Sequence, residues 1–115
     1  MNFHHIGIST ASPDETLYFY STFFGFEEIK RFMFNNELLI FIAHNGFLLE
    51  IVHEPSTKTS PTIHIAWEVE DLQGKIIELE NKGLLPIEGP YRIGKMLVVF
   101  FKGINGEILE LVEKT

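Results

Sequence analysis

The segment Phe3-His4-His5-Ile6-Gly7-Ile8 has a counterpart 59 residues later, Thr62-Ile63-His64-Ile65-Ala66-Trp67. In both segments a histidine stands two residues before a glycine or an alanine. A second match, at an offset of 60 residues, joins Gly46–Val52 to Gly106–Val112, and each of these segments carries a glutamate between apolar residues. The two matches come in the same order and at nearly the same offset, which indicates that the chain contains an internal duplication.

Two helix signals lie between these matches at nearly the same offset. Ser12-Pro13-Asp14-Glu15 has the form of a capping box with proline at the first helical position, and Gly25 marks the end of the helix. In the second copy, Asp71 is the expected N-cap of a helix over residues 71–82 that ends at Gly83. We therefore expect two copies of one unit of about 55–60 residues.

Within each copy the expected order is a strand, a helix and three further strands, which is an α+β fold built from two tandem βαβββ modules. Module 1 covers residues 1–53, a polar linker covers 54–61, and module 2 covers 62–115. Asn35-Asn36 and Asn45-Gly46 are expected to form tight turns, the second of type I′. The further predicted strands are Glu27–Phe34, Glu37–Ala43, Phe47–Val52, Thr62–Val69, a strand near Leu85–Glu88, Lys95–Phe101 and Glu107–Glu113.

Composition narrows the classes of function. Nine Lys and Arg against sixteen Asp and Glu give a net charge of −7, which argues against binding to nucleic acids or anionic membranes. The absence of cysteine excludes disulfides, thiolate metal sites and a cysteine nucleophile. Apolar runs reach only six residues, and the first basic residue is Lys30, so we expect neither a membrane span nor a secretory signal. The expected protein is a soluble cytoplasmic domain.

Strand alternation predicts which polar side chains share a face. Ile6 and Ile8 point toward the helix, so His5 points to the opposite face beside Gly7. His64 is expected to do the same beside Ala66. Glu50 and Glu110 lie between large apolar neighbours, where an ionised carboxylate is costly to bury unless a positive charge neutralises it.

A single histidine or glutamate on a strand is usually structural or solvated. A repeated pair differs, because a pseudo-two-fold axis between the copies would bring both pairs together. His5, Glu50, His64 and Glu110 would then offer two nitrogens and two oxygens to a divalent metal such as Zn, Ni, Co, Mn or Fe. The other histidines, His4, His44 and His53, are interpreted as structural or solvated, and Phe32, Phe34, Phe100 and Phe101 as possible pocket residues.

Three segments resemble the vicinal oxygen chelate superfamily, which includes glyoxalase I, methylmalonyl-CoA epimerase, and the fosfomycin and bleomycin resistance proteins. The last part of the chain resembles the closing segment of glyoxalase I, from Gly89–Gly94 through Phe100-Phe101-Lys102 to Asn105–Leu111. His64–Asp71 resembles the fifth-strand signature, and Phe19–Phe26 resembles the end of the first helix. The resemblance implies a cupped mixed sheet with helices on its outer face, and a homodimer.

The resemblance also implies that His5, Glu50, His64 and Glu110 occupy the metal-ligand positions of the glyoxalase and epimerase branches. The chain departs from glyoxalases at Gly103-Ile104, where Asp-Pro is usual, and no arginine cleanly matches the glutathione anchor, although Lys30 and Arg31 lie near it. The substrate, the identity of the metal and the use of glutathione stay open.

The favoured function is that of a metal-dependent lyase or isomerase acting on a small molecule with two adjacent oxygens. The metal would stabilise an enediolate, and Glu50 or Glu110 would move the proton as the catalytic base. One alternative is a metal-free binding protein that sequesters a ligand, as the bleomycin resistance proteins do. Another is different metal chemistry, such as thiol transfer or dioxygenation. The four ligands can come from one subunit or from two.

Overall fold

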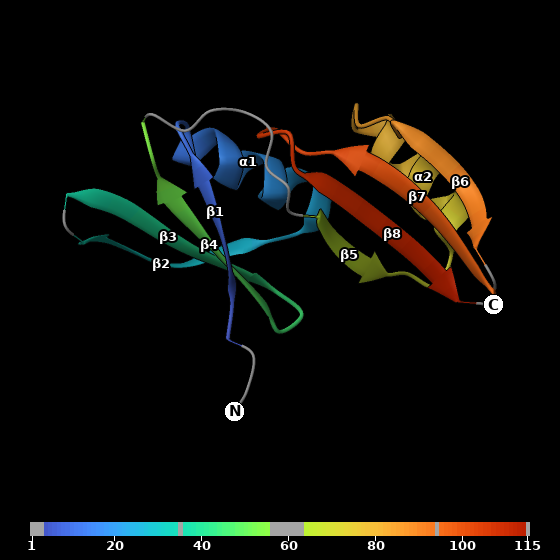
Figure 1. Cartoon of the computed structure of the whole chain (residues 1–115), viewed down its shortest axis with the longest axis horizontal. Helices are drawn as coiled ribbons and strands as arrows, with labels where there is room; N and C mark the ends of the chain where they lie inside the picture. Colours follow the sequence, from blue (N-terminus) through green and yellow to red (C-terminus); the bar gives the residue numbers. More distant parts are fainter. Residues whose placement is uncertain (1–3, 35, 56–63, 94, 115) are drawn as a thin grey trace. The chain divides into compact units, whose positions relative to one another are not determined.

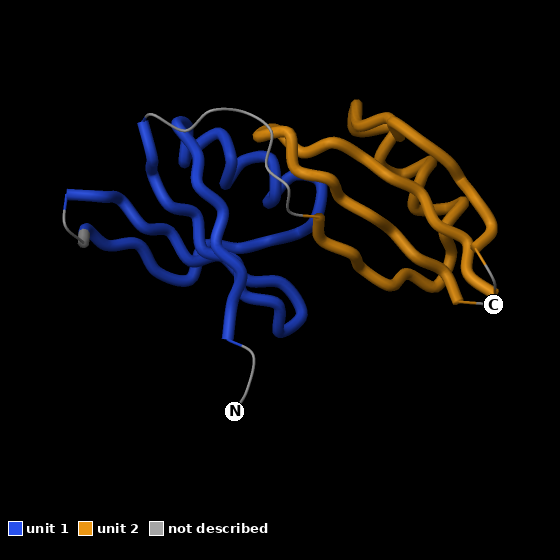
Figure 2. Tube along the Cα trace, in the orientation of Figure 1, with its two compact units in different colours: residues 1–58 blue, residues 59–115 orange. Residues whose placement is uncertain are grey.

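The computed structural model describes residues 4–34, 36–55, 64–93 and 95–114 (Figure 1). The chain divides into two compact units, residues 1–58 and 59–115 (Figure 2). The division falls within the predicted linker 54–61, of which residues 56–61 lie outside the described part of the chain.

The first unit contains one helix and a mixed sheet. Its elements are β1 (Ile6–Thr10), α1 (Pro13–Phe24), β2 (Glu27–Phe34), β3 (Glu37–His44) and β4 (Phe47–His53). The strand order is β1-β4-β3-β2, with β1 parallel to β4 and the other pairs antiparallel.

The second unit repeats this plan. It contains β5 (His64–Glu68), α2 (Leu72–Asn81), β6 (Glu88–Ile93), β7 (Met96–Lys102) and β8 (Ile108–Lys114). Its strand order is β5-β8-β7-β6, again with only the first pair parallel among the described strands. The prediction of an α+β fold with two βαβββ modules is confirmed.

In each unit the helix packs on one face of the sheet, α1 on β3 and β4 and α2 on β8. The alternating pattern of the strands supplies this face with apolar side chains. The fully or almost fully buried residues of the two cores include Ile8, Tyr20, Ile40, Ile42, Leu49 and Ile51 in the first unit, and Ile65, Leu72, Leu79, Phe101, Leu109 and Leu111 in the second. The strand residues that alternate with these core residues point to the opposite face of each sheet.

Several element boundaries follow the sequence signals. Gly25 ends α1 in the left-handed conformation, with φ of 76°. Asn45 and Gly46 both have positive φ, 49° and 80°, as a type I′ turn requires. Asn36 also has positive φ, whereas Asn35 lies outside the described residues, as do residues 62–63 of the strand predicted over 62–69.

Two local predictions are wrong. The strand expected near 85–88 is β6, and it covers Glu88–Ile93 instead. The Gly89–Pro90 dipeptide signals a turn, yet β6 is an edge strand, where proline is tolerated because no ladder hydrogen bond is lost on the open side. The pairing of β6 with β7 shifts register between Glu88 and Tyr91, around this dipeptide.

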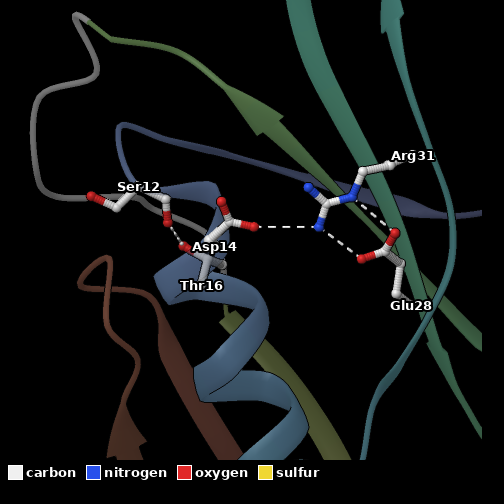
Figure 3. A network of polar contacts seen from close by, with 5 residues as sticks. All are labelled: Ser12, Asp14, Thr16, Glu28 and Arg31. Atoms are coloured by element: carbon white, nitrogen blue, oxygen red, sulfur yellow. Dashed lines mark hydrogen bonds and ion pairs between the residues drawn. The ribbon is translucent and has the colours of Figure 1, made fainter.

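The predicted capping box at α1 is also not formed, since Ser12 makes no side-chain cap hydrogen bond. The N–H of Ser12 donates a hydrogen bond to Thr10 Oγ1 at 3.0 Å, so Thr10 rather than Glu15 satisfies this N–H. The buried Thr16 hydroxyl lies 2.9 Å from the Ser12 carbonyl oxygen (Figure 3).

Among the described residues, no helix is long and apolar enough to cross a membrane.

Candidate metal centre

The His5–Glu50 pair lies on the face of the first sheet opposite the helix. β1 and β4 are parallel with Gly7 opposite Glu50, so His5 comes two residues before the residue paired with the glutamate. The His5 Nε2 atom lies 3.3 Å from Glu50 Oε1. A Cβ atom on Gly7 would lie 3.6 Å from the same oxygen, an ordinary van der Waals contact, so an alanine such as Ala66 of the second module also fits beside the carboxylate.

The His64–Glu110 pair has the same register in the second sheet. Ala66 is opposite Glu110 across the parallel β5–β8 pair, and His64 again comes two residues earlier. The His64 Nε2 atom lies 3.9 Å from Glu110 Oε1. The two glutamate side chains are similarly sheltered, with 19% and 17% of their surface exposed.

An aromatic residue stands across the next strand pair from each glutamate. Phe41 is opposite Glu50, and Phe100 is opposite Glu110. The Phe41 and His5 rings are nearly perpendicular, with 5.3 Å between their centroids, and Phe32 stacks on Phe41 at 6.0 Å. Each pair therefore has a polar end and an apolar flank, which is the usual composition of a ligand site.

The predicted pocket role of Phe101 is wrong, because Phe101 is fully buried in the core of its unit. Alternation places it on the opposite face of β7 from its neighbour Phe100. Phe100 and Phe32 keep at least partial exposure on the faces that carry the glutamates. The side chain of Phe34 lies outside the described part of the chain.

The donor chemistry of both pairs fits a divalent metal. Each pair places one imidazole nitrogen and one carboxylate oxygen within 4 Å on one sheet face, and imidazole with carboxylate is a donor combination suited to transition metals. In the structure the four residues form two separate pairs. Within the described ranges, no three or more His, Asp or Glu side chains lie close enough together to hold one metal ion.

His4 is exposed, in keeping with its interpretation as solvated, but its ring contacts the ring of His5. Strand alternation would place its ring on the face opposite His5, but β1 begins only at Ile6, so pleating does not fix residues 4 and 5. The Nδ1 atoms of His4 and His5 lie 2.7 Å apart, within hydrogen-bond distance. The other two histidines lie at strand ends, where His44 packs against Phe26 at 5.8 Å and His53 is opposite Thr10.

Arg31 is not placed as an anion anchor on the face of the His5–Glu50 pair. Its register partner is the buried Ile40, which puts Arg31 on the helix-covered face. Its guanidinium donates two hydrogen bonds to Glu28, at 2.8 and 2.9 Å, and one to Asp14 of α1 at 3.3 Å (Figure 3). Lys30, opposite Phe41, faces the other way and lies over the Phe32 ring at 5.2 Å.

Comparison with solved structures gives the same fold. A FosX fosfomycin resistance protein from Listeria monocytogenes, complexed with Mn(II) and 1S,2S-dihydroxypropylphosphonic acid, matches with a TM-score of 0.83 at 19% identity, over 99% of this chain and 92% of that one. A putative glyoxalase family protein from Bacillus anthracis matches with a TM-score of 0.82 at 18% identity, over 100% and 96%.

The antibiotic binding protein TnmS3 from Streptomyces sp. CB03234 matches with a TM-score of 0.79 at 16% identity, over 100% of this chain and 99% of that one. No curated protein sequence matches the chain significantly. Residues 4–100 match the family described as the Glyoxalase/Bleomycin resistance protein/Dioxygenase superfamily. The chain, with its duplicated βαβββ module, therefore belongs to the glyoxalase/bleomycin resistance protein/dioxygenase superfamily.

Proposed function

We propose that this protein is a divalent-metal-dependent lyase or isomerase of the glyoxalase I type, acting on a small molecule with two adjacent oxygens. The observation that carries the proposal is the repeated register of its two histidine–glutamate pairs. In both modules the histidine comes two residues before the small residue that faces the glutamate. Neither pair is needed for the core, which lies on the other face of each sheet.

His5, Glu50, His64 and Glu110 would hold the ion, which is Zn, Ni, Co, Mn or Fe. The four ligands come from one chain, or from two chains of a homodimer. The two carboxylates offset the double positive charge, so an ion and its ligands would be neutral overall in partly apolar surroundings. When bound, the ion would supply Lewis-acid polarisation of a substrate carbonyl.

The carboxylates of Glu50 and Glu110 are the groups that can move a proton at this site. One of them would take the proton from the carbon beside the carbonyl. In a hydroxy-carbonyl substrate it would return the proton to the former carbonyl carbon while the hydroxyl proton moves to the former carbonyl oxygen, and in an epimerisation it would return the proton to the opposite face of the same carbon, so that the product is an isomer or epimer of the substrate. Phe41 and Phe100, opposite the two glutamates, would limit the access of water to this proton.

Replacement of either base tests the proposal. We expect Glu50→Gln and Glu110→Gln each to lower turnover of a 2-oxoaldehyde hemithioacetal or an acyl-CoA epimer by about 10²-fold or more, because one of the two is the proposed base and both are proposed metal ligands. Glu68→Gln is the matched control, because Glu68 is an exposed strand glutamate paired with Lys114. Elemental analysis of protein purified without chelator should detect the bound metal. Full turnover in both site variants would contradict the mechanism.

A second candidate is a binding protein without chemistry, which the similarity to the antibiotic binding protein TnmS3 favours. In that case the purified protein would hold no metal, and His5→Ala or His64→Ala would leave ligand affinity unchanged. Similarity to FosX favours a third reading, in which the metal supports addition to a chelated substrate. Activity that survives Glu50→Ala would support that reading over the isomerase.

A further inference from the structure

We propose that His4 is a positioning residue for His5: it accepts the Nδ1 proton of His5 and thereby leaves the Nε2 lone pair of His5 free for a divalent ion. This inference rests on the proposed metal site. It concerns a contact that the duplicated pattern does not contain, because Ile63 precedes the second histidine where His4 precedes the first.

The His5 ring is contacted on three sides. Its Nδ1 atom lies 2.7 Å from His4 Nδ1, and its Nε2 atom lies 3.3 Å from Glu50 Oε1. The centroid of its ring lies 5.3 Å from that of Phe41, and the rings of Phe41 and His4 are both nearly perpendicular to it, at 87° and 80°. These contacts fix both the direction of the ring and the partner of each of its nitrogens.

The protonation pattern follows from the two nitrogens. A neutral imidazole carries one N–H and one lone pair, and only the lone pair can bind a metal. If His4 donated to His5 Nδ1, the proton of His5 would lie on Nε2, facing Glu50, and that nitrogen could not ligate an ion. If His4 accepts, the proton lies on Nδ1 and Nε2 is available beside the carboxylate. Metal binding at the His5–Glu50 pair therefore requires His4 as the acceptor.

The second module lacks this support in its sequence. An isoleucine side chain cannot accept a hydrogen bond, so residue 63 cannot orient His64 in the way that residue 4 orients His5. The two histidines also differ in exposure, with 32% of the His5 side chain exposed and 63% of the His64 side chain. We infer that the first module holds the more preorganised half of the metal site.

The test measures zinc affinity by calorimetry on the full chain. His4→Phe keeps a ring but removes the acceptor, and we expect its zinc affinity to fall by about 10- to 100-fold, as for other residues that orient metal ligands. His4→Asn restores an acceptor oxygen near the position of Nδ1, and its affinity should stay within about threefold of the wild type. His53→Phe, a histidine at the end of β4, is the matched control.

A second readout is the ¹⁵N spectrum of the His5 ring in the metal-free protein, which should show the proton on Nδ1 in the wild type and in His4→Asn, and a shift of the proton toward Nε2 in His4→Phe. Equal zinc affinity in the wild type and His4→Phe, or an equal loss in His53→Phe, would overturn the role of His4 and leave the metal site standing. Absence of zinc binding by the wild type would overturn both proposals. Should His4→Phe fold poorly, His4→Ala replaces it as the variant without an acceptor.

Discussion

At the scale of single residues, Glu107 shows how the chain accommodates its departure from the glyoxalase pattern. The residue is fully buried, and its carboxylate Oε1 accepts a hydrogen bond from the Asn105 N–H at 2.8 Å. The Glu107 carbonyl oxygen accepts from the Gly103 N–H, also at 2.8 Å, which closes the turn before β8. A Cβ atom on Gly103 would overlap the side chain of Glu107 at Cδ, so the glutamate fills the space that an aspartate at 103 would need.

Gly103→Ala is therefore expected to destabilise the protein by about 1–3 kcal/mol, the usual range for overfilling a packed site. The added methyl group would displace the Glu107 carboxyl from its hydrogen bond. Gly7→Ala is the matched control, since its Cβ would meet Glu50 Oε1 at an ordinary 3.6 Å. Urea unfolding measures both. If the clash is the cause, Gly103→Ala combined with Glu107→Ala should lose less stability than the two single losses added together.

At the scale of elements, the two helices begin differently although their sequence signals look alike. The Asp71 side chain caps α2 by accepting from the Gly74 N–H at 3.1 Å, whereas the Ser12 side chain caps nothing. Glu113 of β8 adds a second acceptor to α2, with its Oε1 at 2.7 Å from the Leu72 N–H. Glu113 lies 41 residues from Leu72, so no local sequence motif reveals this cap.

Asp71→Ala should lower the free energy of unfolding by about 1 kcal/mol, the typical cost of a lost N-cap. Ser12→Ala should change it by only a few tenths, because no side-chain cap is removed. Urea unfolding of the two variants side by side measures the difference. Equal losses would mean that the Ser12 hydroxyl also contributes to the start of its helix.

Arg31 of β2 pairs with Glu28 on the same strand and with Asp14 of α1 (Figure 3). Its pairing with Glu28 makes the stability of the fold depend on pH. The hydrogen bonds from Arg31 lower the pKa of Glu28 below its ordinary value. A carboxylate with a lowered folded-state pKa stabilises the fold above its unfolded-state pKa, and this contribution is lost as the pH falls through the folded-state pKa.

Wild-type protein should therefore unfold at a higher temperature than Glu28→Gln at pH 7, and the gap should close as the pH is lowered through and below the ordinary carboxyl range. Thermal unfolding over a pH series provides the measurement. Glu27→Gln, which changes an exposed neighbour on the same strand, should show no such pH-dependent gap. A gap for Glu28→Gln that is constant at all pH values would exclude the ion pair as its cause.

The elements themselves were largely predictable from local signals, and the exceptions have physical causes. β2 matches its predicted range, and the Asn45-Gly46 turn has the expected backbone because few residue pairs tolerate positive φ at both positions. β6 was misplaced because proline and glycine signal a turn in isolation, while an edge strand can absorb them. Pairing with β7, a tertiary effect, decides that strand.

At the scale of the whole molecule, the duplication made the candidate site predictable. No single histidine or glutamate of the chain indicates a metal site by itself. Only the repeat identifies four of them as candidate ligands: His5, Glu50, His64 and Glu110. The structure pairs them within each module, whereas their union at one ion stays a prediction. The contact of His4 with His5 was missed because alternation was extended to residues that precede the strand.

One ion held by all four ligands would link the modules thermodynamically. At an ion concentration of about 100 times the dissociation constant, binding should stabilise the folded chain by roughly 2.7 kcal/mol, and a chelator should remove that gain. His5→Ala or His64→Ala alone should each abolish most of the gain, and the double variant should lose little more, because both imidazoles serve the same ion. His53→Ala should keep it. If each pair instead bound its own ion, a single variant would keep about half of the stabilisation, and the unfolding midpoint measured with and without zinc separates the two cases.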